Sequence, residues 1–242
     1  MTGLRFAPAP NNLPPLEDRG VHLWRVDLSG EPLPGTDLIL DANERRRAAR
    51  FVFDRDRNRF LRAHHALRVL LGAYLGEPPD GICIESNRHG KPRVVGQPLG
   101  FNISHSADCG LIAISKIAEI GVDLEMLRLP SGAGGIAESV FSATERESLA
   151  DMSNEEFASA FFTCWTRKEA YLKALGVGLM LNPATVTVGV KTNRVRLTRP
   201  ERGAGEFVDV VSIAERSDRA EAVAVVGGFS DLAIFEYGYS SP

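Results

Sequence analysis

Three side chains between Phe162 and Leu175 have the residue types and the spacing of a group that binds phosphate or a metal ion. If this stretch is helical, Trp165, Glu169 and Lys173 are four residues apart and lie one above another along one ridge. A carboxylate then stands between an aromatic ring and an ammonium group. The same spacing also fits an ordinary surface salt bridge beside a core tryptophan, so this stretch alone leaves both interpretations open.

Two further carboxylates lie two residues apart in the apolar segment GVDLE. In a β-strand, Asp123 and Glu125 leave on the same face, with Cα atoms about 6.7 Å apart by the strand rise. At an effective dielectric of 20, two charges at that separation repel each other by roughly 2.5 kcal/mol. With Glu169 nearby they would protonate or hold a cation, and Mg²⁺ suits a few carboxylates plus phosphate oxygens better than Ca²⁺. The alternative is the polar face of a half-exposed strand.

Two short segments before these carboxylates carry groups that suit phosphate oxygens. The segment NISHS ends a predicted strand and presents four polar side chains at its tip, Asn102, Ser104, His105 and Ser106. The segment HGKPR forms a turn from which Lys91 projects. Small hydroxyl donors and an imidazole in a tight turn can hold an anion. An ordinary turn, whose Asn and Ser side chains bond their own backbone, and a solvated lysine are the alternatives.

Arginines are concentrated in one part of the chain. Nine arginines and only two acidic residues lie between Arg45 and Arg68, whereas the whole chain has a formal net charge of -3. Arg47 and Arg59 are spread over predicted helical positions, where guanidinium groups can bind phosphate or an acidic partner. Equally, such arginines can lay their stems over apolar surface and leave the charged ends in water.

The composition predicts a soluble protein with a proper hydrophobic core. The chain has 242 residues, of which 44% are hydrophobic, and its negative net charge is not that of a dedicated nucleic-acid binder. Its three cysteines have no CxxC spacing, and we find neither a signal peptide nor a membrane-spanning stretch. We therefore expect a cytoplasmic protein that binds neither nucleic acid nor membrane.

The periodicity predicts an α+β fold of two pseudo-symmetric subdomains, each a small, mostly antiparallel sheet packed on a long helix. We expect a proline-rich flexible leader over 1–18, an N-terminal α+β half over 19–117, and a C-terminal α+β half over 118–242 that carries the metal ligands. Helices are predicted over 41–51, 54–75, 143–151 and 154–175. Strands are predicted over 22–28, 82–85, 100–104, 110–115, 119–126, 185–190, 195–198, 207–213 and 222–227.

Five motifs in one order resemble the Sfp-type 4′-phosphopantetheinyl transferases over about residues 45–178. They are GKP at Gly90, NISHS at Asn102, GVDLE at Gly121, FSxxE at Phe141 and WxxKExxxK at Trp165. The resemblance implies a monomer that binds coenzyme A between its two halves. It also implies transfer of the phosphopantetheine arm to a serine of an apo acyl or peptidyl carrier protein, which leaves adenosine 3′,5′-bisphosphate.

The resemblance also implies roles for individual residues. The implied magnesium ligands are Asp123, Glu125 and Glu169, and the implied coenzyme A contacts are Arg47, Arg59, Lys91, Ser104, His105 and Lys173. Arg47 falls where the family can place a basic residue for the 3′-phosphate. Three positions earlier, where the family often has another, this chain has Glu44.

The chemistry of the residues agrees with this role, and Glu169 is the candidate base for the serine hydroxyl. Two other function classes use similar side chains. A magnesium-dependent phosphohydrolase or nuclease also gathers acids and a lysine around a phosphate, but it has no need of the NISHS and GKP pair. A non-catalytic carrier-protein-binding module would be expected to lack one of the acids or Lys173, and all are present.

Overall fold

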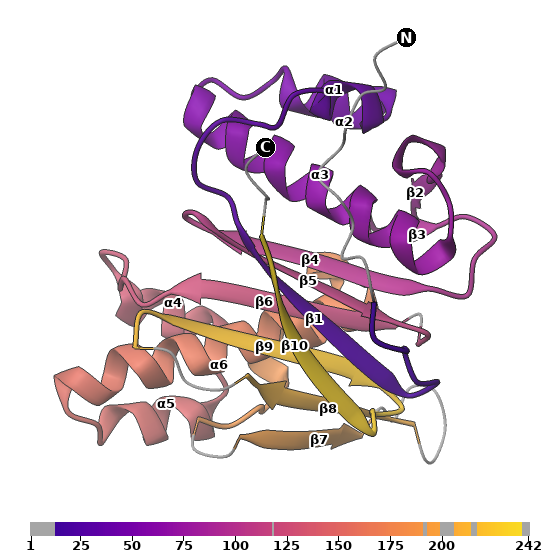
Figure 1. The fold of residues 1–242 in the computed structure, drawn as a ribbon. Coiled ribbons are helices and arrows are strands. Elements are labelled where there is room, and N and C mark those ends of the chain that lie inside the picture. The colour runs from indigo at the N-terminus through magenta and orange to yellow at the C-terminus, as the bar shows by residue number, and fades with distance from the viewer. Residues whose placement is uncertain (1–12, 118, 191–192, 199–205, 214–216, 239–242) are drawn as a thin grey trace, which may run out of the picture.

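The computed structural model describes residues 13–117, 119–190, 193–198, 206–213 and 217–238. Two four-stranded sheets lie against each other, with one long helix, α3 or α6, on the outer side of each (Figure 1). The α-helices are α1 Thr36–Ile39, α2 Ala42–Ala48, α3 Asp54–Leu75, α4 Ala133–Val140, α5 Ala143–Ala150 and α6 Asn154–Leu175. The strands are β1 Gly20–Asp27, β2 Ile84–Ser86, β3 Pro92–Val94, β4 Gly100–Ser106, β5 Cys109–Ser115, β6 Ile120–Met126, β7 Arg194–Thr198, β8 Phe207–Ser212, β9 Arg219–Val226 and β10 Asp231–Tyr237.

The molecule has four layers, which are α3, the first sheet, the second sheet and α6. The alternation of side chains along each strand holds neighbouring layers together. Along β1, Trp24 and Val26 belong to the cluster that includes α3, whereas Val21 and Leu23 belong to the cluster between the sheets. Strand β6 continues the same rule, because its apolar side chains enter the cluster between the sheets. The residues that it points there are Ile120, Val122 and Leu124. The intervening residues, Gly121, Asp123 and Glu125, therefore face α6.

The two sheets repeat one topology, and the α+β fold of two similar sheet-and-helix units is confirmed. In the first sheet β1 pairs antiparallel with β5, and β5 pairs with β4. In the second, β6 pairs antiparallel with β9, which pairs with β8 and then β7. In each unit the first strand thus pairs with the last strand of the antiparallel run that follows it: β1 pairs with β5, and β6 pairs with β9.

The last strand lies outside this repeat. Strand β10 pairs parallel with β1, so the end of the chain completes the sheet of the first unit. The predicted boundary near residue 118 stays a prediction, and β10 crosses it. Most of the predicted leader lies outside the described residues. Within the part that the structure describes, Leu13 and Leu16 pack against the core of the first unit.

Helix ends were the most predictable local features. The predictions for 54–75 and 154–175 are confirmed, and Gly76 and Gly176 take the left-handed conformation that ends each helix. The predicted strand over 185–190 is wrong, because Pro183–Thr185 forms a short 3₁₀ turn and residues 186–190 pair with no strand in the described part of the chain. Among the described residues, no helix is both long enough and apolar enough to cross a bilayer.

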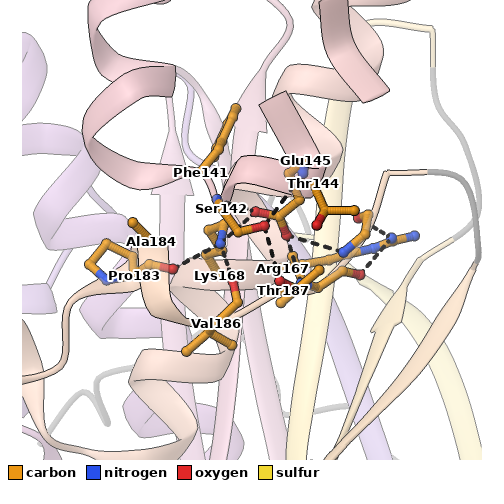
Figure 2. A network of polar contacts seen from close by, with 12 residues as sticks. Phe141, Ser142, Thr144, Glu145, Arg167, Lys168, Pro183, Ala184, Val186 and Thr187 are labelled. Atoms are coloured by element: carbon orange, nitrogen blue, oxygen red, sulfur yellow. Dashed lines mark hydrogen bonds and ion pairs between the residues drawn. The ribbon is translucent and has the colours of Figure 1, made fainter. Parts of the chain in front are cut away.

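A buried ion pair joins α5 to α6 and explains why a lysine, Lys168, is buried on α6. Lys168 Nζ lies 2.7 Å from Glu145 Oε2, and both side chains are almost completely buried (Figure 2). The ammonium also donates to the carbonyl oxygens of Pro183 and Val186, and Glu145 accepts from the backbone N–H of Val188 at 2.7 Å. Glu145 is also the capping-box residue of α5, as the sequence predicts.

The contacts of Glu145 favour its ionised form. Burial opposes ionisation of Glu145, but the hydrogen bond from Lys168 and those from backbone amides outweigh it and hold the pKa of Glu145 below its ordinary value. A buried charge whose partner is removed is strongly destabilising. The pair therefore fixes α5 and the loop after α6 to the helix that carries Glu169 and Lys173.

We predict that Lys168→Met lowers the free energy of unfolding by about 3–5 kcal/mol, because Glu145 loses its charge partner in a buried position. Urea denaturation followed by circular dichroism measures this change. The matched control is Lys116→Met, whose exposed ion pair with Asp18 should contribute little to stability, so that this variant should unfold almost as the wild type does. Equal losses in the two variants would contradict the structural role of Lys168.

Candidate active site

Edge strands β4 and β6 meet side by side, and side chains of the NISHS motif hold them together. Asn102 Oδ1 accepts from the backbone N–H of Val122 at 2.9 Å. Two positions on, Ser104 Oγ donates to Asp123 Oδ1 at 2.8 Å, and Ser106 Oγ donates to Glu125 Oε2 at 2.9 Å. Every second residue of a strand lies on the same face, so Asn102, Ser104 and Ser106 all point towards β6. Each of them bonds a different residue of the GVDLE motif. We call these three contacts the β4–β6 seam.

The glycine of GVDLE lets α6 approach β6 closely. A Cβ atom on Gly121 would lie closer than 3.0 Å to the backbone of Ala170 and of Ala174 in α6. No side chain larger than a hydrogen fits there without moving the helix. The close approach places Lys173 of α6 next to Asp123 of β6, two residues after the glycine.

A small cavity of about 370 Å³ collects the predicted acidic residues and the lysine. Its lining comprises Ile103, Ser104, His105, Asp123, Glu125, Trp165, Glu169 and Lys173. Lys173 Nζ lies 2.6 Å from Asp123 Oδ1 and donates to Ser104 Oγ at 3.2 Å. Asp123, Glu125, Glu169 and Lys173, which are distant in sequence, thus share one cavity.

The three carboxylates disfavour one another's ionisation. Burial raises the pKa of Asp123, and the ammonium of Lys173 only partly offsets it. Burial also raises the pKa of Glu169, and the charge of Asp123 raises it further. The pKa of Glu125 is raised in the same way by burial and then by Asp123 and Glu169, against a hydrogen bond from Ser106. A cation in this cavity would relieve that repulsion.

The donor set fits a hard divalent cation, although the side chains are not arranged around one. Among the described residues no three acidic, histidine or cysteine side chains stand in metal-binding geometry. Asp123 Oδ1 faces Lys173, but its buried Oδ2 has no hydrogen-bond partner within the described part of the chain. Asp123 is only 3% exposed, and burying a carboxylate oxygen that lacks a hydrogen-bond partner costs folding free energy unless a ligand binds it. Carboxylate oxygens are also the ligands that Mg²⁺ prefers.

A larger cavity of about 830 Å³ opens next to the small one, and His105, Glu169 and Lys173 line both. Arg47 also lines the larger cavity, with its guanidinium 5.1 Å from the centre of the Phe60 ring. The pKa of His105 is lowered, first by burial and then by the cations around it, which include Lys173 and Arg47. The larger cavity thus brings Arg47, Lys91 and Lys173 into one lining together with acidic side chains, and its basic groups can contact an anion.

Two of the predicted coenzyme A contacts lie elsewhere or are engaged by the protein. Arg59 lines neither cavity, because its guanidinium bonds Asp108 at 2.8 Å and Asp56 at 3.2 Å. Lys91 lines the larger cavity, but its ammonium donates to the carbonyl oxygens of Ile120 at 3.0 Å and Ala174 at 2.8 Å. Burial lowers the pKa of Lys91 to about 8. In this conformation Lys91 ties β6 and α6 to the first unit.

Trp165 connects the small cavity to a third one of about 400 Å³ with a mostly apolar wall. Its indole ring stacks on Phe161 with the ring centres 6.2 Å apart, and it lines both cavities together with Glu125. The other apolar side chains of the third cavity include Met126, Ile136 and Phe162. Trp165 is therefore a wall of the site and not an ordinary core residue.

Sequence reasoning placed Asn102 and Ser106 among the candidate phosphate contacts but missed that they bind β6. It took the polar residues of NISHS as a turn at the end of a strand, whereas the strand continues through Ser106. The missed signal is the period of two: Asn102, Ser104 and Ser106 alternate with Phe101, Ile103 and His105. One polar face and one mostly apolar face indicate an edge strand with two different neighbours.

Comparisons with known proteins agree with this geometry. Residues 119–225 match the family model of the 4′-phosphopantetheinyl transferase superfamily, and residues 36–117 match that of the 4′-phosphopantetheinyl transferase N-terminal region. The chain is 40% identical over 180 residues to the 4′-phosphopantetheinyl transferase HetI of Nostoc sp., an alignment that covers 72% of this chain and 76% of that protein. The chain therefore belongs to the 4′-phosphopantetheinyl transferase family.

More distant relatives extend the comparison. The chain is 30% identical over 173 residues to the 4′-phosphopantetheinyl transferase of Bacillus subtilis, which covers 71% of this chain and 75% of that protein. It is 29% identical over 168 residues to the L-aminoadipate-semialdehyde dehydrogenase-phosphopantetheinyl transferase of Xenopus laevis, over 60% of this chain and 55% of that protein.

We predict that Gly121→Ala lowers the free energy of unfolding by about 3 kcal/mol or more and abolishes activity, because the new methyl group cannot coexist with the backbone of α6. Chemical denaturation measures the loss. The matched control is Gly134→Ala in α4, where a Cβ atom meets nothing within 4 Å and the substitution should stabilise the helix slightly. A Gly121→Ala protein of wild-type stability would show that α6 does not depend on this close approach.

Proposed function

We propose that this chain transfers the 4′-phosphopantetheine moiety of coenzyme A to a serine of an apo acyl or peptidyl carrier protein and that it does so as an Sfp-type enzyme. The products are the holo-carrier and adenosine 3′,5′-bisphosphate. The observation that carries the proposal is the convergence of Asp123, Glu125, Glu169 and Lys173 on one cavity. Membership in the transferase family supports the same conclusion.

The arrangement of the cavities suits coenzyme A. We assign the diphosphate to the region that both main cavities share, where Lys173 and His105 offer positive or donating groups. The larger cavity, which Arg47 lines, takes the phosphorylated nucleoside. The third cavity, behind Trp165, receives the pantetheine arm, because an uncharged chain suits its apolar wall.

Asp123, Glu125 and Glu169 would hold Mg²⁺. When bound, the ion would supply positive charge against the diphosphate oxygens and so reduce the repulsion that an attacking hydroxyl meets. Lys173 adds a second positive charge on the same side of the cavity. Ser104 and Ser106 keep Asp123 and Glu125 turned towards the cavity through the β4–β6 seam.

The reaction requires one proton acceptor and one stabilised leaving group. The serine oxygen of the carrier forms a bond to the β-phosphorus, and the bond from that phosphorus to the bridging oxygen breaks. Glu169, which lines the cavity beside Lys173, accepts the serine proton. Lys173 stabilises the negative charge that collects on the departing adenosine 3′,5′-bisphosphate.

We predict that Glu169→Gln lowers kcat by about 10²–10⁴-fold, because the serine proton loses its acceptor. Lys173→Ala should lower kcat by about 10²–10³-fold without unfolding the protein, because the leaving group loses a charge partner. Intact-mass spectrometry of apo-carriers incubated with Mg²⁺ and coenzyme A measures the modified fraction over time. Coenzyme A binding to both variants, measured by calorimetry, should stay detectable.

Glu147→Gln, an exposed carboxylate on α5 outside the cavities, is the matched control and should retain full activity. Near-normal turnover by Glu169→Gln would reject Glu169 as the base. Consumption of coenzyme A without any carrier protein would favour a magnesium-dependent hydrolase instead. Binding of carriers without any mass change would favour the non-catalytic module. The monomeric state and cytoplasmic location stay predictions.

A further inference from the structure

Three consecutive apolar residues are exposed at the start of α3. Phe51, Val52 and Phe53 form the bend between α2 and α3, and Val52 is 88% and Phe53 66% exposed. A single exposed apolar side chain is ordinary, but a contiguous run of three is not, because leaving it in water forfeits the free energy of burial. Such a run marks a surface that another molecule covers.

Arginines surround this run. The segment from Arg45 to Arg57 contains six arginines and two aspartates, which gives it a formal charge of +4 in a chain of net charge -3. Arg50 is exposed and has no carboxylate partner among the described residues. Arg55 and Arg57 form only exposed pairs with their aspartate neighbours on α3, and such pairs are weak. We call Phe51, Val52 and Phe53 with Arg46, Arg50, Arg55 and Arg57 the α3 patch.

The α3 patch continues into the wall of the proposed active site. The ring of Phe51 lies 5.4 Å from the ring of Phe60, which lines the larger cavity beneath Arg47. One turn further along α3, Arg59 bonds Asp108 in the turn between β4 and β5. In Figure 1 the start of α3 and this turn lie at the same end of the molecule. Ser106 and Ala107, just before Asp108, line the third cavity.

We infer that the α3 patch is the docking surface for the acidic face of the carrier protein that delivers the acceptor serine. This inference rests on the proposed function. An apolar centre within a rim of arginines complements a partner with apolar side chains and carboxylates around them. Arg50, Arg55 and Arg57 attract the acidic face, and Val52 and Phe53 bury their side chains against it. A partner seated there borders the cavities that hold coenzyme A.

The test measures binding without turnover. A purified acidic carrier whose acceptor serine is replaced by alanine is labelled, and its Kd for each variant is measured by fluorescence anisotropy at two salt concentrations. The carrier is one that the wild-type enzyme modifies in its unsubstituted form. Val52→Glu and Arg50→Glu should each raise the carrier Kd at least tenfold, and the Arg50→Glu protein should show a weaker salt dependence. The Kd for coenzyme A should stay within twofold.

Two matched controls separate docking from general effects of charge. Ile234→Glu places a carboxylate on a 38% exposed apolar residue of β10, and Lys116→Glu reverses an exposed charge next to Asp18. Both should bind the carrier within twofold of the wild type. A carrier Kd that Val52→Glu and Arg50→Glu leave unchanged would overturn the inference.

Two other outcomes also discriminate. If sedimentation shows that the wild type self-associates and Val52→Glu does not, the α3 patch is an interface between copies of this chain and the inference is wrong. If the wild type modifies no carrier at all, the proposed function fails, whatever the patch does. Loss of carrier binding in Val52→Glu with intact coenzyme A binding and an unchanged melting temperature supports carrier docking.

Discussion

The β4–β6 seam is the contact on which the site depends. Side chains of one edge strand hold the carboxylates of the other, so that Ser104 fixes Asp123 and Ser106 fixes Glu125. The seam also covers two strand edges that would otherwise expose unpaired backbone groups. A single set of contacts therefore joins the two sheets and turns the acidic residues towards α6.

The arrangement of charges at the seam is costly for folding alone. Asp123 is nearly fully buried, its pKa is raised by burial, and one of its oxygens lacks a partner within the described part of the chain. An apolar residue at this position would be cheaper to bury. Lys173 offsets only part of the cost. The remainder is what a bound cation and a diphosphate would relieve, which is why we treat this region as functional and not structural.

Local signals in the sequence predicted the two long helices. The helical spacing of Trp165, Glu169 and Lys173 also predicted that these three side chains share one side of α6. Gly76 and the capping box at Ser153 are such signals, since they depend on neighbours only. The ion pair of Lys168 has no such local signal, because its partner Glu145 lies on another helix. The parallel pairing of β10 with β1 joins the two ends of the chain and leaves no local signal either. The role of Arg59 as a coenzyme A contact stays a prediction, and in this structure its guanidinium bonds Asp56 and Asp108.

The central claim is that Asp123 and its neighbouring carboxylates hold a divalent ion against the diphosphate of coenzyme A. The most direct measurement is ³¹P relaxation of bound coenzyme A with Mn²⁺ in place of Mg²⁺, in the wild type and in Asp123→Asn. We expect strong paramagnetic broadening of the diphosphate resonances in the wild type and its loss in the variant. Equal broadening in both proteins, or none in the wild type, would contradict it.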